Sequence, residues 1–130
     1  MLAVDTNVIV RYLVRDEAAQ TAKADQLIHS QEILVLKTVV LETEWVLRYR
    51  YGLDRSAILA ALRALAGLPN IHLEDAPAVA HAFVWFAAGM DFADALHLAS
   101  SVPASQFVTF DQDLAKLARR LKAGEVFLPA

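Results

Sequence analysis

Cysteine is missing from this chain of 130 residues, and glycine and proline are scarce, with four of each. Without cysteine the protein has no disulfides and no thiolate metal sites, so we expect a reducing, cytoplasmic environment. The chain also lacks an excess of basic charge, since its formal net charge is −3 at pH 7. A protein that holds nucleic acid by basic charge alone is therefore not expected. Any such contact would need a local basic patch or a metal ion.

Long hydrophobic runs are absent too, although 57% of the residues are hydrophobic. A membrane-spanning helix needs about 18 uninterrupted apolar residues. The longest candidate, residues 76–90, is interrupted by Pro77, His81 and Gly89. The chain reaches the acidic Asp5 without a basic start, so we expect no secretory signal. The length suits one domain with its own core, and we expect residues 1–130 to form it.

The sequence does contain a regular alternation of apolar runs and helical patterns. Short apolar runs predict strands near residues 2–4, 32–36, 70–73 and 106–109, and a fifth near 126–128. Helical spacing predicts seven helices, of which six begin at aspartates suited to capping: Asp5, Asp16, Asp54, Asp75, Asp91 and Asp111. This alternation predicts an α/β fold, a parallel sheet of four to five strands covered by helices on both faces.

Acidic residues from four distant segments fall near one edge of this predicted sheet. Asp5 follows the first strand, Asp111 follows the fourth, and Glu42 lies in the helix after the second. Asp91 and Asp94 begin the helix before the fourth strand and share one helix face. In an open parallel sheet the functional crevice lies beyond the carboxyl ends of the strands. We therefore expect a cluster of carboxylates there.

Such a cluster needs a cation. Two carboxylates about 4 Å apart repel by about 4 kcal/mol at an effective dielectric constant of about 20. Oxygen ligands without cysteine or clustered histidine favour Mg²⁺ or Mn²⁺ over Zn²⁺. Mg²⁺ keeps several waters, which leaves positions for a phosphate oxygen and an attacking water. The chemistry that this suggests is metal-assisted hydrolysis of a phosphodiester.

A purely structural interpretation competes with the metal site. Asp5, Asp91 and Asp111 all stand where a helix cap is wanted, and Thr109 is an ordinary turn residue. Glu42 is harder to explain in this way, because it lies in an apolar helix start, V-V-L-E-T-E-W-V-L. One of Glu42 and Glu44 is expected to face solvent, and spacing alone does not decide which.

These acidic segments resemble the four motifs of PIN-domain nucleases, most closely the VapC-type toxins of toxin–antitoxin pairs. The matching residues are D-T-N-V from Asp5, Glu42 in V-L-E-T-E-W-V-L, Asp94 in D-F-A-D-A-L-H-L-A, and Asp111 in V-T-F-D-Q-D. The resemblance covers essentially the whole chain. It implies an α/β/α sandwich with a short parallel sheet, and cleavage of RNA with Mg²⁺ or Mn²⁺.

By this resemblance, Asp5, Glu42, Asp94 and Asp111 bind the metal and act in catalysis. It also favours Glu42 over Glu44. Further residues match positions that assist, by orienting ligands or water: Asn7, Asp91, Thr109 and Asp113. For Asp113 a first-turn acid stabilised by the helix dipole is an equal alternative.

Partners follow from the resemblance and from side-chain chemistry. The resemblance implies an RNA substrate, a small antitoxin protein and a homodimer. It implies no association with a membrane. Arg11 and Arg15, or Arg48 and Arg50, are candidate phosphate contacts, with solvated helix faces as the alternative. The basic residues 116–122 are explained by the dipole of the last helix. Phe83, Trp85 and Phe86 cannot all face one side, so an exposed aromatic among them would mark a partner surface, with the core as the alternative.

Other functions stay open. A PIN-type nuclease of RNA processing would need no antitoxin. A receiver domain would need a second acid beside Asp5 and a lysine after the last strand, and the chain has neither. A dehalogenase-type hydrolase would need an aspartate where Asn7 stands. A binding module without nuclease activity is the remaining alternative, and metal-dependent RNA cleavage distinguishes it from the enzyme.

Overall fold

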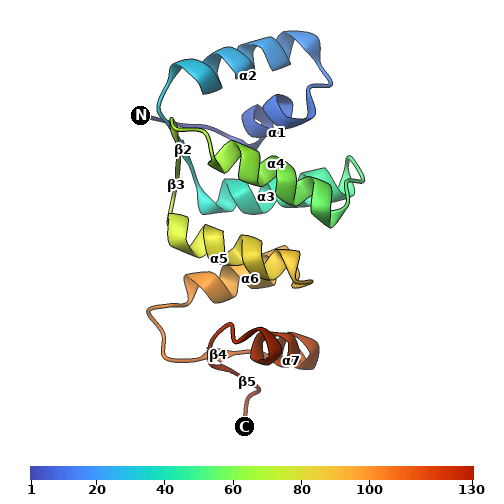
Figure 1. Cartoon of the computed structure of the whole chain (residues 1–130), viewed down its shortest axis with the longest axis vertical. Helices are drawn as coiled ribbons and strands as arrows, with labels where there is room; N and C mark the ends of the chain where they lie inside the picture. The colour runs from blue at the N-terminus through green and yellow to red at the C-terminus, as the bar shows by residue number, and fades with distance from the viewer. The chain divides into compact units, whose positions relative to one another are not determined.

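Five short strands and seven helices alternate along the chain, as the computed structural model, which describes residues 1–130, shows (Figure 1). The strands are β1 (Leu2–Ala3), β2 (Ile33–Val35), β3 (Ile71–Leu73), β4 (Phe107–Val108) and β5 (Val126–Phe127). The helices are α1 (Thr6–Val14), α2 (Ala18–Ser30), α3 (Lys37–Tyr49), α4 (Arg55–Ala66), α5 (Ala76–Ala87), α6 (Phe92–Ser100) and α7 (Gln112–Leu121).

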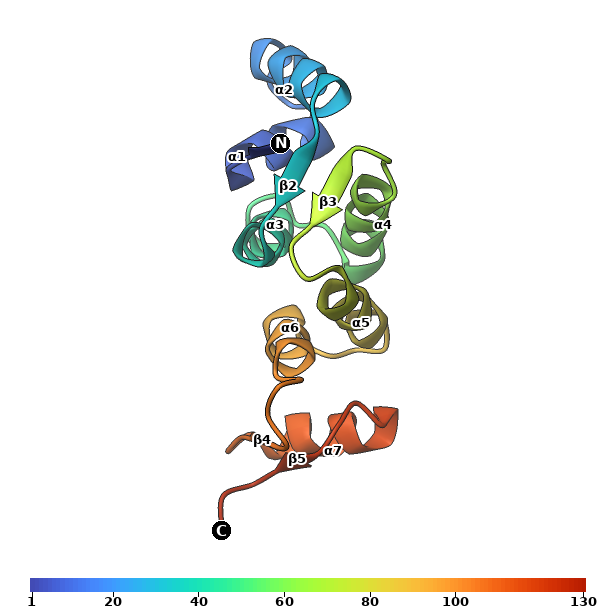
Figure 2. The same ribbon diagram turned by 90° about the vertical axis from the view of Figure 1, so that its left-hand side faces the viewer.

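Every strand pairing is parallel. Strands β1, β2 and β3 pair in that order, with Leu2 opposite Ile33 and Ile33 opposite Ile71. Strand β4 pairs with β5, with Phe107 opposite Val126. Figure 2 shows β2 and β3 side by side and pointing the same way. The predicted α/β class with short parallel strands is therefore confirmed, and the five strands pair as a group of three and a group of two.

The chain divides into two compact units, Met1–Ala76 and Pro77–Ala130, which we call the N-terminal and C-terminal units. In the N-terminal unit, α1 packs against α2 and α3, and α4 contacts both α3 and β3. The apolar residues whose helical spacing predicted these helices lie on one face of each helix, and that face is buried. The most deeply buried apolar side chains of this unit include Ile9, Ile28, Ile33, Leu47 and Ile58, none more than 1% exposed.

The core of the C-terminal unit contains an aromatic cluster. Phe86 packs edge-on against Phe92 with ring centroids 5.3 Å apart, and Phe83 lies 6.2 Å from the same ring. Both Phe83 and Phe86 are buried, whereas Trp85 on the other side of α5 is only half-buried. Helix α7 packs against β5. The core interpretation thus holds for the two phenylalanines, and Trp85 remains accessible.

Two of the predicted caps are wrong. Asp16 does not cap α2, because Glu17 accepts the Gln20 N–H instead and Asp16 is bonded to Arg11 and Tyr51. Asp75 has a left-handed backbone, φ +55°, and its carboxylate pairs with Lys37 at 3.1 Å. The caps at Asp5, Asp54, Asp91 and Asp111 are confirmed. None of the seven helices combines the length and the apolarity that crossing a bilayer demands.

Candidate functional site

Asp5 stands at the junction of β1 and α1. It caps α1, and its Oδ1 accepts the Thr6 N–H at 2.8 Å. The side chain is exposed, and this local bond leaves the second carboxylate oxygen without a partner in the chain. Asp5 can therefore cap α1 with one carboxylate oxygen and bind a ligand with the other.

A pocket of about 220 Å³ brings Asp5 together with Glu42. Both acids line it, although they are far apart in sequence, one at the start of α1 and the other in α3. Two arginines, three uncharged polar residues and two valines complete the lining, which consists of Asp5, Thr6, Asn7, Val10, Arg11, Glu42, Val46, Arg50 and Tyr51. Asn7, a predicted assisting residue, thus shares the pocket with both acids.

Thr6 has an unusual environment in this pocket. The residue is only 6% exposed, and its Oγ1 is the one buried side-chain polar atom without a hydrogen-bond partner. Such an unpaired buried group lowers the stability of the fold by about 1–3 kcal/mol, unless a ligand or a water molecule forms the missing hydrogen bond. By sequence Thr6 is an ordinary turn residue, yet a signal for its burial is present. It precedes the buried Ile9 and Val10 by three and four residues and shares their helix face.

The two glutamates of α3 have different environments. Glu44 is 1% exposed and forms two hydrogen bonds with Arg48, from Nε at 2.6 Å and from an Nη at 3.1 Å. This partner raises the pKa of Arg48 above its ordinary value. Glu42 is exposed and lines the pocket. Glu44 is therefore a buried ion-pair residue, and Glu42 is the glutamate available to a ligand.

Arg11 is held in place by three neighbours. Its guanidinium donates to Gln20 at 2.7 Å, Asp16 at 3.1 Å and the Tyr51 hydroxyl at 3.0 Å. Arg15, the other candidate RNA contact, instead makes a bidentate pair with Asp25 at 2.6 Å and does not line the pocket. Arg11 thus lines the same pocket as the two acids, with its guanidinium held by other neighbours.

The C-terminal unit carries the other candidate acids. Asp91 caps α6 by accepting the Asp94 N–H at 3.2 Å, and Asp111 caps α7 by accepting the Leu114 N–H at 3.0 Å. Thr109 accepts the Asp111 N–H at 3.0 Å, which orients the residue after β4. Asp113 lies in the first turn of α7, and its exposed side chain makes no hydrogen bond.

Asp94 is in an electrostatically unfavourable position. Partial burial, followed by the neighbouring carboxylates of Asp91 and Asp111, raises its pKa above the ordinary value, and His97 opposes this. Asp91 and Asp111 therefore both disfavour the ionised form of Asp94. A cation bound by Asp94 would remove the penalty.

This penalty predicts that Asp94→Asn stabilises the metal-free protein while removing a candidate ligand. Because the pKa of Asp94 is raised in the folded state, the folded protein favours the protonated carboxyl group. Asp94 therefore contributes most to stability below its ordinary pKa, where it is protonated. This contribution is lost as the pH rises through the raised pKa and the group ionises. At pH 7 in EDTA we expect Asp94→Asn to raise the Tm by about 2–4 °C. Below the ordinary aspartate pKa the difference should shrink.

Thermal unfolding followed by fluorescence at several pH values checks this prediction. Asp113→Asn is the matched control, because it neutralises an exposed acid in the neighbouring helix and should not raise the Tm. A wild-type Tm equal to that of Asp94→Asn at pH 7, or a difference that grows in acid, would contradict the electrostatic interpretation.

The donor chemistry fits a hard divalent cation. The candidate acids offer only oxygen, and Asp5 and Glu42 share a pocket with an unpaired hydroxyl. No group of three or more His, Asp and Glu side chains is gathered closely enough to form a metal centre on its own.

Comparisons with known proteins give one family. No curated protein matches the sequence. Among solved structures, the chain is similar to the Mycobacterium tuberculosis toxin VapC20, described as cleaving the sarcin–ricin loop, with 21% identity and a TM-score of 0.46. The match covers 89% of this chain and 94% of that one. A sequence model of the PIN domain matches residues 2–120. Because that match extends over most of the chain, and includes all four acids that the motifs singled out, the chain belongs to the PIN domain family.

Proposed function

We propose that this protein is a metal-dependent endoribonuclease that acts as the toxin of a toxin–antitoxin pair. The observation that carries the proposal is the match of the PIN domain over residues 2–120, which spans both units and all four motif acids. This span also supports one functional domain, residues 1–130. The shared pocket of Asp5 and Glu42 and the influence of Asp91 and Asp111 on Asp94 support the assignment of the acids.

In this proposal Asp5, Glu42, Asp94 and Asp111 hold Mg²⁺, for which Mn²⁺ is an alternative. When bound, such an ion polarises a phosphate oxygen and lowers the pKa of a coordinated water. The exposed Glu42 and the unpaired oxygen of Asp5 are accessible ligands. Asn7, Asp91, Thr109 and Asp113 assist by orienting acids or water. The bonds from Asp94 N–H to Asp91 and from Asp111 N–H to Thr109 support this role for two of them.

The chain's own groups then position the RNA and move the proton. Arg11 and Arg50 line the pocket of Asp5 and Glu42 and bind the phosphodiester. One carboxylate accepts a proton from the attacking water, whose oxygen bonds to phosphorus as the bond to the leaving ribose oxygen breaks. The leaving oxygen then takes up a proton. Arg15 contacts RNA only if a phosphate replaces Asp25 as its partner.

Removing divalent ions is expected to abolish cleavage. A labelled single-stranded RNA incubated with the protein and Mg²⁺ should be cut, EDTA should stop the reaction, and added Mg²⁺ or Mn²⁺ should restore it. Because water rather than the 2′-hydroxyl attacks, RNA with 2′-O-methyl groups should still be cleaved, and no cyclic phosphate should form. Gel electrophoresis measures the extent of cleavage, and mass spectrometry of the products shows whether a cyclic phosphate forms. Undiminished cleavage in EDTA, or a cyclic phosphate product, would refute this mechanism.

The toxin role adds a cytoplasmic location, a homodimer and a small antitoxin to the proposal. An antitoxin arginine near Asp5 and Glu42 would inhibit, since it replaces the charge of the metal. The test is the adjacent reading frame. Its product should bind the protein and suppress RNA cleavage, whereas a nuclease of RNA processing would be active without such a partner.

A further inference from the structure

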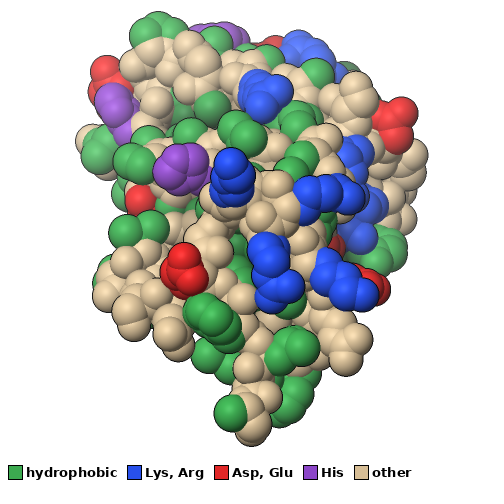
Figure 3. Space-filling view, turned by 60° about the horizontal axis from the view of Figure 1, so that its bottom comes forward, with side chains coloured by type: hydrophobic (Ala, Val, Ile, Leu, Met, Phe, Trp, Pro, Cys, Tyr) green, Lys and Arg blue, Asp and Glu red, His purple; other side chains and the backbone are tan.

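Four basic side chains gather along α7 and at its end. Lys116, Arg119 and Arg120 are spaced three and four residues apart, on the helix face opposite the buried Leu114 and Ala118. Lys122 follows immediately at the C-cap. All four are exposed and none forms an ion pair. Figure 3 brings the C-terminal end of the chain forward, and basic side chains are prominent there. We call Lys116, Arg119, Arg120 and Lys122 the basic strip.

The helix dipole does not account for the whole basic strip. Its effect is confined to the last turn of a helix, and Lys116 stands five residues before the last residue of α7, Leu121. In a chain with a net charge of −3, four unpaired cations within seven positions form a local positive patch. Such a patch is the electrostatic signature of a polyanion-binding surface.

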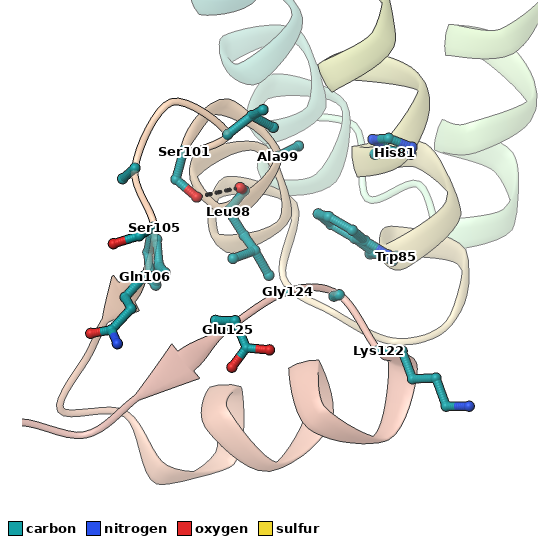
Figure 4. Close-up of a pocket in the computed structure, with 14 residues that line it drawn as sticks. His81, Trp85, Leu98, Ala99, Ser101, Ser105, Gln106, Lys122, Gly124 and Glu125 are labelled. Carbon is teal, nitrogen blue, oxygen red and sulfur yellow. Dashed lines mark hydrogen bonds between the residues drawn. The ribbon is translucent and has the colours of Figure 1, made fainter.

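The basic strip borders a pocket with an aromatic wall. This pocket, of about 430 Å³, lies in the C-terminal unit, and Lys122 is part of its lining (Figure 4). His81 and Trp85, one turn apart on α5, form the wall, with their rings nearly parallel at 16° and centroids 5.7 Å apart. Lys122 and Arg119 also line a neighbouring hollow of about 320 Å³ together with Phe127. The two hollows share Lys122, Gly124 and Glu125, so cations and aromatic rings lie on the same part of the surface.

Polar groups in the pocket are available to a ligand. Figure 4 shows Gln106 and Glu125 at the pocket, each immediately before a strand. Neither forms a hydrogen bond through its side chain within the protein, and neither does the indole N–H of Trp85. An amide, a carboxylate and an indole can therefore pair with the edges of a heteroaromatic ring.

We propose that this pocket and the basic strip form a second binding surface for single-stranded RNA, with a base stacked against Trp85 and phosphates on Arg119 and Lys122. Aromatic side chains beside a basic groove are the common means of holding single strands. The pocket volume also suits a small-molecule group. An acidic peptide would use the cations but would leave the aromatic wall unexplained.

This surface is separate from the acids within the same unit. The pocket includes Gln106 and Glu125, which precede β4 and β5, whereas Thr109 and Asp111 follow the carboxyl end of β4. Because β4 and β5 are parallel, their amino ends lie at the opposite edge from Asp111. The inference rests on the proposed function for its substrate. It adds a site that retains the strand away from the point of cleavage.

Binding measured without cleavage tests the inference. The probe is a fluorescein-labelled oligoadenylate of about 16 nucleotides, titrated with the full chain in EDTA and followed by anisotropy. We expect Trp85→Leu to weaken binding about tenfold, while Trp85→Phe, which keeps a stacking ring, stays close to wild type. Arg119→Gln with Lys122→Gln should lower the slope of log K against log salt by about 1.4.

Matched variants separate a specific surface from general charge. Lys23→Gln with Arg63→Gln also removes two exposed cations from helices, outside this surface, and should leave the salt slope unchanged. Circular dichroism of each variant checks the fold. Equal binding by wild type, Trp85→Leu and the Arg119/Lys122 variant would overturn the inference. So would displacement of the RNA by polyglutamate together with no effect of Trp85→Leu, which would indicate a peptide-binding surface.

Cleavage of the same RNA with Mg²⁺ is a separate measurement. Wild-type protein that binds RNA through Trp85 but never cleaves it would overturn the proposed function and leave this surface in place. If the protein cleaves RNA normally but its binding is insensitive to Trp85 and the basic strip, the proposed function stands and the second binding surface is overturned.

Discussion

Asp5→Asn is expected to lower the rate of RNA cleavage by about a thousandfold without unfolding the protein. Asparagine caps helices as well as aspartate does and retains an oxygen for the Thr6 N–H, so α1 should form normally. It lacks the negative charge that a divalent ion requires. Losing a ligand that stabilises charge in the transition state by several kcal/mol corresponds to a loss of this size. Initial rates with a labelled RNA and saturating Mg²⁺ give the measurement.

Asp54→Asn is the matched control for this experiment. Asp54 caps α4 much as Asp5 caps α1, with its Oδ1 accepting the Ala57 N–H at 2.8 Å, but it does not line the pocket of Asp5 and Glu42. Its asparagine variant should cleave RNA at the wild-type rate. If Asp5→Asn retained more than about a tenth of the activity, Asp5 would be a structural cap and not a metal ligand.

Arg48→Ala is expected to destabilise the fold by about 3–5 kcal/mol. Glu44 is almost completely buried, and Arg48 neutralises it with two hydrogen bonds while also lying 4.5 Å from the centre of the Tyr49 ring. Without Arg48 the buried carboxylate must either stay ionised without a partner or take up a proton. Either state is costly compared with the wild-type pair. Equilibrium unfolding in urea measures the difference.

Two further variants make this prediction sharper. Asp25→Ala removes the Arg15–Asp25 pair, which has equally short contacts but lies in a more exposed position, and it should cost much less stability than Arg48→Ala. Glu44→Met combined with Arg48→Leu removes both charges and should recover most of the stability, because neither partner is left unpaired. A loss for Arg48→Ala as small as that for Asp25→Ala would show that Glu44 does not depend on its partner.

The separate roles of Asp5 and Arg48 should be visible in the two measurements together. Asp5→Asn changes the chemistry at a pocket whose fold is intact, whereas Arg48→Ala changes the energy of a buried pair away from that pocket. We therefore expect the first variant to lose activity at normal stability. The second should lose stability and keep its activity in the fraction that remains folded.

The sequence by itself determined the helices and strands and the family. Alternation of apolar runs with helical spacing predicted all five strands, because a strand buried in a parallel sheet and an amphipathic helix each leave a periodic trace in the chain. The positions of Asp5, Asp91 and Asp111 at helix starts followed from local capping chemistry. The order of the four acidic motifs indicated the PIN domain, which the match over residues 2–120 confirms.

Only the tertiary structure decided which groups of similar local chemistry are buried, paired or accessible. Glu42 and Glu44 are two residues apart on one helix, and only packing shows that one meets Arg48 in the core while the other lines a pocket. By sequence Asp16 is the better cap of α2, yet the distant Tyr51 engages Asp16 and Glu17 caps the helix instead. The unpaired Thr6 hydroxyl and the wall of His81 and Trp85 likewise depend on their surroundings. Local propensity is encoded within a few residues, but burial and charge pairing are set by neighbours that are distant in the chain.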